Sequence, residues 1–301
     1  MADQTKVEET AGDAASRRST GYHMGTVDAV ISVEDVNRQA KAMAVDVPVE
    51  KIAGLANNNP FVNLKNLRCG YGKMEIIHGF NLQVAKGQSL CLIGPNGAGK
   101  STVLHAIYGL NTMMGGQILV GEGADAKDVA GLTANQKLKR AGIAYILQDK
   151  SIFPDMTVEE NLWMGGFLME TTAQAKEAAE KVFAKYDRLA QRRKHLAKVL
   201  SGGERRLLEI SRALVMNPDV LLVDEPSIGL EPRFIDMVFE ILDDLQHGEG
   251  KTIIMVEQNA KKGLEFADIG YVLVSGELAI AGTGDELLEN EDVGRLFLGG
   301  N

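Results

Sequence analysis

The chain has 301 residues, 45% of them hydrophobic and 24% charged, which is typical of a globular protein and argues against a disordered or fibrous one. Its formal net charge of -9 argues against nucleic acid as the primary partner, because such binding usually needs a basic face. No apolar run approaches the roughly 18 residues needed to cross a bilayer, and Cys69 and Cys91 provide neither a disulfide framework nor a thiolate metal site.

Residues 1–59 differ in composition from the rest of the chain, and we interpret them as an N-terminal extension that is partly flexible or helical. Charged residues mix here with Ala, Ser and Thr, and the cluster Asn57-Asn58-Asn59-Pro60 predicts a break. Ser32 has the character of a helix N-cap. A marginal helix in a flexible arm and a docking element for a partner both remain open. The extension lacks the apolar core of a secretory signal, so we expect the chain to stay in the cytosol.

Residues 60–301 alternate short apolar runs with amphipathic stretches, the pattern of an α/β domain with a mostly parallel core sheet. Residues 155–217 form an insert rich in helix formers, in which Thr157 and Glu160 predict a capping box. Trp163 in this insert fits either a core or a contact surface. The expected buried strands are residues 90–93, 143–147, 220–223, 252–256 and 271–274. A helical stripe expected to face a core is Val182, Phe183, Tyr186 and Leu189.

A glycine-rich loop follows the strand at residues 90–93 and fits the phosphate-binding pattern G-x-x-x-x-G-K-[ST], which arises by chance in about one such chain in a hundred. The loop and the next residue are Gly94, Pro95, Asn96, Gly97, Ala98, Gly99, Lys100, Ser101 and Thr102. Its amides and the helix start behind it can face phosphate oxygens. Lys100 is expected to reach the β- and γ-phosphates and Ser101 to ligate Mg²⁺. That helix is expected to bear Val103, Leu104, Ile107 and Leu110 on one face.

Two acids, Asp224 and Glu225, follow the apolar strand at residues 220–223. Alone, such a pair fits a solvated turn. Combined with a phosphate-binding loop, it predicts that Asp224 holds Mg²⁺ through water and that Glu225 orients or deprotonates an attacking water molecule.

A second helix start suited to anions is predicted at Leu200-Ser201-Gly202-Gly203-Glu204, ahead of a helix that ends before Asn217. The chain has one complete phosphate loop and is therefore expected to bind one nucleotide there. A second helix start that binds phosphate has a function only if it contacts a different nucleotide. With this motif the chain resembles, over residues 61–300, the ATP-binding-cassette (ABC) ATPases, whose signature is LSGGE. The resemblance implies a P-loop NTPase fold with an antiparallel β subdomain and an inserted helical subdomain.

The resemblance also implies the roles of further residues. In the family, two cassettes pair head to tail, and Ser201, Gly202 and Gly203 of one face the ATP bound to the other. Tyr71 falls where the family stacks an aromatic ring on adenine, and Gln148 where a glutamine senses Mg²⁺ and the attacking water. Residues 227–231 match the loop that crosses the dimer interface. Gln258 replaces the family's switch histidine, and it can donate a hydrogen bond to a γ-phosphate but cannot titrate.

Within the family the chain resembles one ATP-binding subunit of the branched-chain amino-acid importers, and the related urea, amide and aromatic-acid importers share the same features. The similar strings are FPDMTVEENL (153–162), DEPSIGL (224–230), VEQN (256–259) and GTGDELL (282–288). Two stretches depart from that pattern. Residues 149–151 replace a glycine-arginine stretch, and residues 204–206 read Glu-Arg-Arg, as in the lipopolysaccharide exporter, where Glu-Gln-Gln is usual.

The resemblance therefore implies an ATP-hydrolysing importer subunit on the cytoplasmic side of the bacterial inner membrane, with ATP and Mg²⁺ as cofactors. Its implied partners are a second cassette, identical or different, membrane permease subunits and, indirectly, a solute-binding protein, but no nucleic acid. The alternatives are a subunit for urea, amide or aromatic-acid uptake, a soluble non-transport ABC ATPase, and a cassette that binds ATP without turnover. The solute site lies in other subunits, so this sequence does not name the solute.

Overall fold

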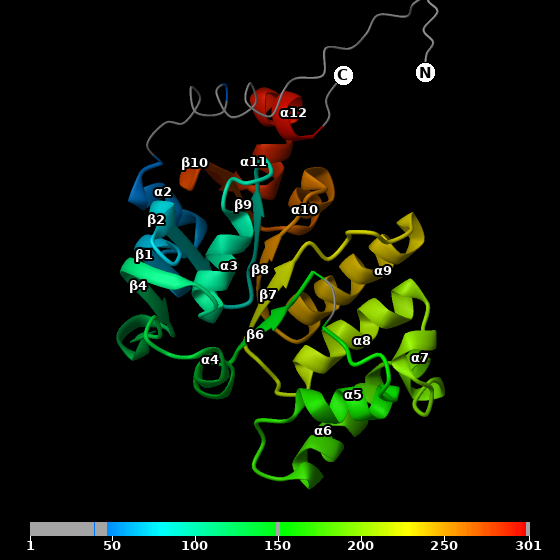
Figure 1. Ribbon diagram of the computed structural model, residues 1–301. Helices are drawn as coiled ribbons and strands as arrows, with labels where there is room; N and C mark the ends of the chain where they lie inside the picture. The colour runs from blue at the N-terminus through cyan, green and yellow to red at the C-terminus, as the bar shows by residue number, and fades with distance from the viewer. Residues whose placement is uncertain (1–38, 40–46, 149–150, 299–301) are drawn as a thin grey trace, which may run out of the picture. The chain divides into compact units, whose positions relative to one another are not determined.

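The computed structural model describes residues 39, 47–148 and 151–298 (Figure 1). The helix expected after Ser32 lies outside these residues. So do Asp149 and Lys150, two of the residues at which the sequence differs from the importer pattern. Within them no helix is long and apolar enough to cross a membrane. The strands are β1 (Pro60–Tyr71), β2 (Met74–Ala85), β3 (Ser89–Ile93), β4 (Thr112–Val120), β5 (Lys127–Asp128), β6 (Ile143–Ile146), β7 (Val220–Asp224), β8 (Thr252–Val256), β9 (Ile269–Val274) and β10 (Glu277–Thr283).

The helices are interleaved with these strands, as the alternating sequence pattern predicts. They are α2 (Val49–Leu55), α3 (Lys100–Tyr108), α4 (Ala134–Ala141), α5 (Val158–Gly165), α6 (Thr172–Lys185), α7 (Asp187–Gln191), α8 (Gly202–Leu214), α9 (Pro232–Asp243), α10 (Ala260–Phe266), α11 (Gly284–Leu288) and α12 (Glu291–Phe297). Short 3₁₀ turns are η1 (Gly123–Asp125) and η2 (Ala197–Val199), and a π-helical turn is η3 (Asp244–Gly248).

The strands form two sheets, which confirms the expected fold class. A six-stranded sheet has the order β10-β9-β3-β8-β7-β6, with parallel pairing throughout except between β9 and β10. A four-stranded antiparallel sheet has the order β2-β1-β4-β5. The helices α5 to α8 form the expected insert between β6 and β7.

Both faces of the six-stranded sheet are buried, which explains the continuous apolar runs of its strands. Leu90 and Leu92 of β3 face a core that includes α3 and the antiparallel sheet. Cys91 and Ile93, pointing the other way, face a core that includes α9 and α10. Each such buried side chain contributes roughly 1.5–3 kcal/mol. The helix α3 is therefore held between two sheets, and its first turn is fixed where β3 ends.

Five expected element boundaries were wrong. The strand β3 begins one residue earlier than expected, at Ser89, and β7 ends one residue later, at Asp224. The helix α3 ends at Tyr108 because Gly109 adopts a left-handed conformation (φ 90°), and this leaves Leu110 beyond the helix and 49% exposed. The strand β6 stops at Ile146, and Leu147 is 38% exposed. The Leu147 carbonyl accepts a hydrogen bond from Arg206 Nη1 at 2.8 Å instead of pairing in the sheet. The last predicted strand begins two residues earlier, at Ile269.

The helical insert has a core of its own. Val182, Phe183 and Leu189 are buried in it and Tyr186 packs against it, as the predicted stripe requires. Trp163 packs against the same cluster. At the start of α5 the predicted capping box is present, with Thr157 N donating to Glu160 Oε2 at 2.7 Å and Glu160 N donating to Thr157 Oγ1 at 3.3 Å. The boundaries of the insert at residues 155 and 217 stay a prediction.

The last residues of the predicted extension 1–59 pack against the following part of the chain. In α2, Ile52 is 1% exposed and belongs to the core that contains β1 and β2. Asn57 and Asn58 are left-handed, with φ of 54° and 53°, so the expected break before β1 is present as a turn. The boundary between residues 59 and 60 stays a prediction.

Lys137 of α4 is a fully buried cation at the carboxyl end of α3. Its Nζ donates hydrogen bonds to the carbonyl oxygens of Ala106 at 3.1 Å and Ile107 at 2.8 Å. These carbonyls belong to the last turn of α3, where no helical partner remains for them. Burial lowers the pKa of Lys137 to about 8. The lysine thus fixes the far end of the helix that begins at the phosphate-binding loop.

We expect Lys137→Met to destabilise the protein by about 1–3 kcal/mol, because two buried carbonyls lose their donor. The control is Lys139→Met, an exposed lysine of the same helix, which should change the free energy of unfolding by less than about 0.5 kcal/mol. Urea unfolding of the three proteins measures this difference. Equal stability of the two variants would show that the Lys137 contacts contribute nothing.

Candidate functional site

The phosphate-binding loop joins the carboxyl end of β3 to the first turn of α3. Its glycines Gly94, Gly97 and Gly99 have φ of 143°, 81° and 101°, which L side chains rarely adopt. A Cβ at Gly94 would also lie 2.2 Å from the Leu273 carbonyl oxygen, so both the backbone conformation and this steric clash exclude a side chain at Gly94. A Cβ at Gly97 would meet nothing within 4 Å, so the loop is open on that side.

Lys100, predicted to reach phosphates, folds back over this loop. It is 6% exposed, and its Nζ donates to the carbonyl oxygens of Gly94 at 2.8 Å and Pro95 at 3.1 Å. Burial lowers its pKa, while the nearby Glu225 and Asp224 carboxylates act in the opposite direction. No side chain of the described residues caps α3, so its first amides remain available. A cation and free helix amides over an open loop fit a phosphate chain.

Ser101 and Asp224, two of the residues expected to hold Mg²⁺, are in contact. Ser101 Oγ donates to Asp224 Oδ1 at 3.0 Å, and Asp224 is only 6% exposed. The second carboxylate oxygen, Oδ2, accepts from the Tyr145 hydroxyl at 2.7 Å. A hydroxyl and a carboxylate beside a phosphate-binding loop are the hard oxygen ligands that Mg²⁺ prefers, so these residues fit the ion. Sequence reasoning missed Tyr145, whose signal was a hydroxyl inside an otherwise apolar strand.

Glu225 follows directly and is partly buried. Its φ of 44° is unusual for a residue with a side chain, and its amide donates to the Val256 carbonyl at 2.8 Å. Burial raises the pKa of Glu225, and the charge of Asp224 raises it further, while Lys100 acts in the opposite direction. A carboxylate with a raised pKa beside a phosphate-binding loop is suited to accept a proton from water.

Gln148 and Gln258 lie at the ends of β6 and β8 and are both exposed. No hydrogen bond among the described residues joins either side chain to Ser101, Asp224 or Glu225. The structure thus places Gln258 on the loop after β8, and it places Gln148 at the edge of a groove described below. Among the described residues, neither side chain is hydrogen-bonded to the phosphate loop, to Ser101 or to the two carboxylates, so the roles of Gln148 and Gln258 stay predictions.

Glu257 is a second residue that sequence reasoning missed. This carboxylate is 1% exposed and accepts hydrogen bonds from Ser227 Oγ at 2.7 Å, Ser227 N at 3.3 Å and Asn259 N at 2.8 Å. It therefore ties the loop after Glu225 to the loop that carries Gln258. A charged residue directly after a fully buried strand was the available signal, because a buried charge requires such partners.

Tyr71, expected to stack on adenine, ends β1 with 46% of its surface exposed. Its hydroxyl lies 2.5 Å from His105 Nδ1 of α3, and the two rings meet edge to face at 6.1 Å. Burial lowers the pKa of His105 below its usual value, with Asp224 acting in the opposite direction. The exposed aromatic surface thus lies beside the helix that follows the phosphate loop.

The signature residues lie at the start of α8. Ser201 Oγ accepts from Glu204 N at 3.3 Å, and Ser201 N donates to Glu204 Oε2 at 2.9 Å, so a capping box holds this helix start. Ser201 and Gly202 are exposed, whereas a Cβ at Gly203 would lie 2.3 Å from the Phe234 ring. No hydrogen bond of the described residues joins this helix start to the phosphate loop.

A groove of about 570 Å³ lies beside the signature helix and contains Gln148, Gly202 and Arg206 in its lining. Arg206 is 4% exposed, and its Nη1 donates to the Leu147 carbonyl and to Glu209 Oε2, so it connects the segment of Gln148 to α8.

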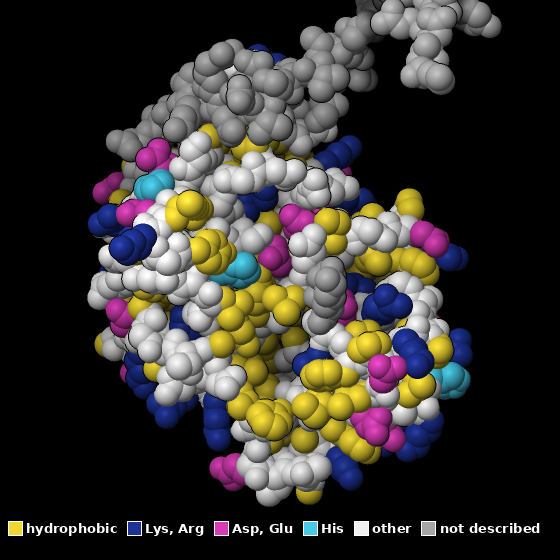
Figure 2. All heavy atoms as spheres, viewed as in Figure 1, with side chains coloured by type: hydrophobic (Ala, Val, Ile, Leu, Met, Phe, Trp, Pro, Cys, Tyr) yellow, Lys and Arg dark blue, Asp and Glu magenta, His cyan; other side chains and the backbone are white. Residues whose placement is uncertain are grey.

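The face of the molecule shown in Figure 2 carries a group of hydrophobic side chains at its middle, between α4 and the helices α5 and α8.

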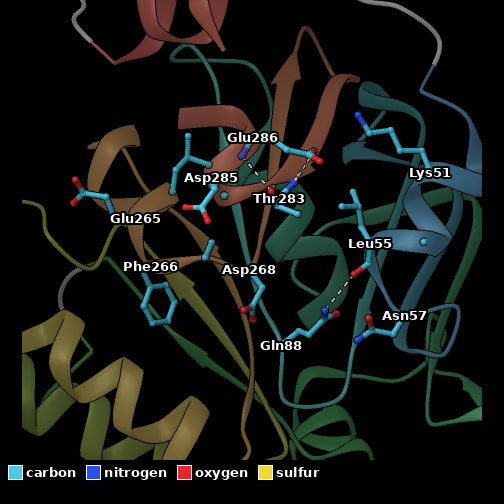
Figure 3. Close-up of a pocket in the computed structure, with 14 residues that line it drawn as sticks. Lys51, Leu55, Asn57, Gln88, Glu265, Phe266, Asp268, Thr283, Asp285 and Glu286 are labelled. Carbon is cyan, nitrogen blue, oxygen red and sulfur yellow. Dashed lines mark hydrogen bonds between the residues drawn. The ribbon is translucent and has the colours of Figure 1, made fainter. Parts of the chain in front are cut away.

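A different cavity, of about 750 Å³, lies between α2 and α11 (Figure 3). Its lining includes Lys51 and the carboxylates of Glu265, Asp268 and Asp285. Gln88 spans one side of it and donates from Nε2 to the Leu55 carbonyl at 3.2 Å. None of the site residues expected from the sequence lines this cavity.

Comparison with known proteins agrees with this geometry. The sequence profile of the ABC transporter family matches residues 77–228. The high-affinity branched-chain amino acid transport ATP-binding protein BraG of Pseudomonas aeruginosa is 40% identical over 230 residues, which cover 76% of this chain and 96% of BraG. The probable branched-chain amino acid transport ATP-binding protein LivF of Archaeoglobus fulgidus is 36% identical, over 77% of this chain and 96% of that protein.

Among solved structures, the ADP conformation of MJ1267, an ATP-binding cassette of an ABC transporter, is similar with a TM-score of 0.69 and 27% identity. The match covers 80% of this chain and 99% of MJ1267. The matched region includes the phosphate loop, Asp224 and Glu225. The fold, the loop and the family match lead to one conclusion: the chain belongs to the ABC transporter family and is one of its ATP-binding, ATP-hydrolysing subunits.

Proposed function

We propose that the chain is the ATPase subunit of an ABC importer for branched-chain or related amino acids. One observation carries the proposal for the reaction: a buried lysine over a phosphate-binding loop, a serine bonded to an aspartate, and a glutamate of raised pKa lie at one edge of the sheet. The names of BraG and LivF support the class of solute.

In the proposed reaction the chain positions groups around the terminal phosphate. Lys100 and the first amides of α3 bind the phosphate oxygens, and Ser101 with Asp224 would hold Mg²⁺. That ion would supply positive charge beside the phosphate oxygens. Glu225 accepts a proton from the attacking water, and Gln258 donates a hydrogen bond toward the γ-phosphate. Gln148 senses the ion and the water, and Tyr71 stacks on adenine. Catalysis of this kind depends mainly on positioning and charge stabilisation.

A second cassette completes the proposed site. Ser201, Gly202 and Gly203 present a helix start suited to anions, yet no hydrogen bond joins them to the phosphate loop of the same chain. We therefore assign them to the nucleotide of a partner cassette, which is either a second copy or a different subunit. Permease subunits and, through them, a solute-binding protein are the remaining partners, and the proposed location is the cytoplasmic face of a bacterial inner membrane.

Purification of the tagged full chain from native membranes tests the importer assignment. We expect permease subunits and a second cassette to accompany it, and loss of the chain to reduce uptake of labelled leucine, isoleucine or valine. Uptake of urea or of aromatic acids in the same cells serves as the comparison. Recovery of the chain with ribosomes or nucleic acid, and without membrane subunits, would instead identify a soluble non-transport ABC ATPase.

Lys100→Ala should weaken ATP binding by roughly 10- to 100-fold, since a charge-assisted contact of about 1.5–3 kcal/mol is removed. Equilibrium binding of ATP with Mg²⁺ measures the loss. Lys181→Ala, at a lysine that is 78% exposed in α6, is the control and should bind ATP as the parent does. Unchanged affinity of Lys100→Ala would remove the phosphate-loop assignment.

Glu225→Gln should still bind ATP but hydrolyse it about 10²–10⁴-fold more slowly, because the amide cannot accept the proton. Glu240→Gln, at an exposed position of α9, is the matched control and should retain the parent rate. The raised pKa of Glu225 also predicts that the parent rate falls on acidification at a pH above 4.5, the ordinary value, as the base becomes protonated. ATPase assays of the assembled complex against pH test both points, and a parent-like rate for Glu225→Gln would exclude it as the base.

A further inference from the structure

Tyr145 is a polar residue in a strand that otherwise faces the core. Its neighbours Ile143, Ala144 and Ile146 are at most 1% exposed. In the parallel register of β6 and β7, Tyr145 lies opposite Leu222, two residues before Asp224. Cross-strand partners and alternate residues of one strand point to the same face, so the side chains of Tyr145, Leu222 and Asp224 share a face of the sheet. The hydroxyl of Tyr145 reaches Asp224 Oδ2 at 2.7 Å.

The Asp224 carboxylate is therefore held by one donor on each oxygen. Ser101 donates to Oδ1 from the first turn of α3, and Tyr145 donates to Oδ2 from β6. A carboxylate oxygen can only accept, so the Tyr145 hydroxyl is the donor of this hydrogen bond. Because two donors from different elements bind the two oxygens, rotation of the carboxylate breaks at least one of these bonds.

The ring of Tyr145 is itself held in place. The His105 ring meets it edge to face at 5.8 Å, and the Tyr108 ring lies at 5.4 Å. His105 is in turn hydrogen-bonded to the hydroxyl of Tyr71 at 2.5 Å. A continuous row of side chains thus runs from Tyr71, the proposed adenine contact, to the Asp224 carboxylate.

We propose that Tyr145 is a positioning residue of the metal site, whose hydroxyl orients the Asp224 carboxylate toward Ser101 and thereby sets the affinity for the nucleotide-bound divalent cation. The proposal rests on the proposed function of Ser101 and Asp224. Its physical basis is that hydrogen bonds to a metal-binding carboxylate fix its orientation before the ion arrives, and that their loss typically lowers metal affinity about 10- to 100-fold.

The test compares Tyr145→Phe with Tyr108→Phe in the full chain, using Mn²⁺ as a paramagnetic probe and ADP to avoid turnover. Tyr145→Phe removes only the hydroxyl and retains the ring beside His105. We expect it to lower the Mn²⁺ affinity of the ADP-loaded protein about tenfold, measured by electron paramagnetic resonance, with unchanged ADP affinity in EDTA. Tyr108→Phe should leave both affinities unchanged, because the Tyr108 hydroxyl makes no hydrogen bond to a described residue. Parent-like ADP affinity in EDTA also shows that each variant is folded.

A double-variant comparison shows whether Tyr145 acts through Asp224. Asp224→Asn should lower the Mn²⁺ affinity, and adding Tyr145→Phe should produce no further loss. Mn²⁺ affinity of Tyr145→Phe within twofold of the parent, or independent losses in the double variant, would overturn the proposal. Failure of the parent to bind ADP in EDTA would overturn the proposed nucleotide site and the role of Tyr145 with it. If the parent binds ADP in EDTA and Tyr145→Phe has the Mn²⁺ affinity of the parent, only the role of Tyr145 is overturned and the nucleotide site stands.

Discussion

Parallel pairing of β3, β8 and β7 is the constraint on which the site depends, because it brings the carboxyl ends of three strands to one edge of the sheet. The phosphate loop leaves β3 there, Asp224 ends β7, and Glu257 follows β8. Residues more than 120 positions apart in the chain thus meet within hydrogen-bond distance, as Ser101 and Asp224 do. No local property of either segment produces that contact.

Buried polar groups at this edge are stable because each one has partners nearby. Lys100 donates to loop carbonyls, the two oxygens of Asp224 accept from Ser101 and Tyr145, and Glu257 accepts from the backbone and side chains of adjacent loops. An unpaired group of this kind costs about 1–3 kcal/mol, and a charged one costs more. The network therefore does two things: it offsets the cost of burial, and it holds the reacting groups in one geometry.

The surface of the helical insert has a different character. Its signature helix begins with exposed residues and a capping box, and the groove beside it combines apolar side chains with Arg206. Arg206 connects this helix to the carbonyl of Leu147, next to Gln148. Arg206 therefore connects the insert directly to the segment of the parallel sheet that leads to Gln148.

The sequence by itself determined the phosphate loop, the paired acids, the signature motif and the α/β class, because each is a local pattern whose backbone requirements are encoded in neighbouring residues. It predicted five strands of the parallel sheet to within two residues, but it named no residues for β1, β2, β4, β5 and β10. It also extended α3 to Leu110, past the glycine that ends the helix, and β6 to Leu147, whose carbonyl is bound by a distant arginine. Only the tertiary structure decided the roles of Tyr145 and Glu257. Tyr145 is hydrogen-bonded to Asp224, and Glu257 is hydrogen-bonded to Ser227. These contacts depend on the order and register of the strands, which no single segment of the sequence determines.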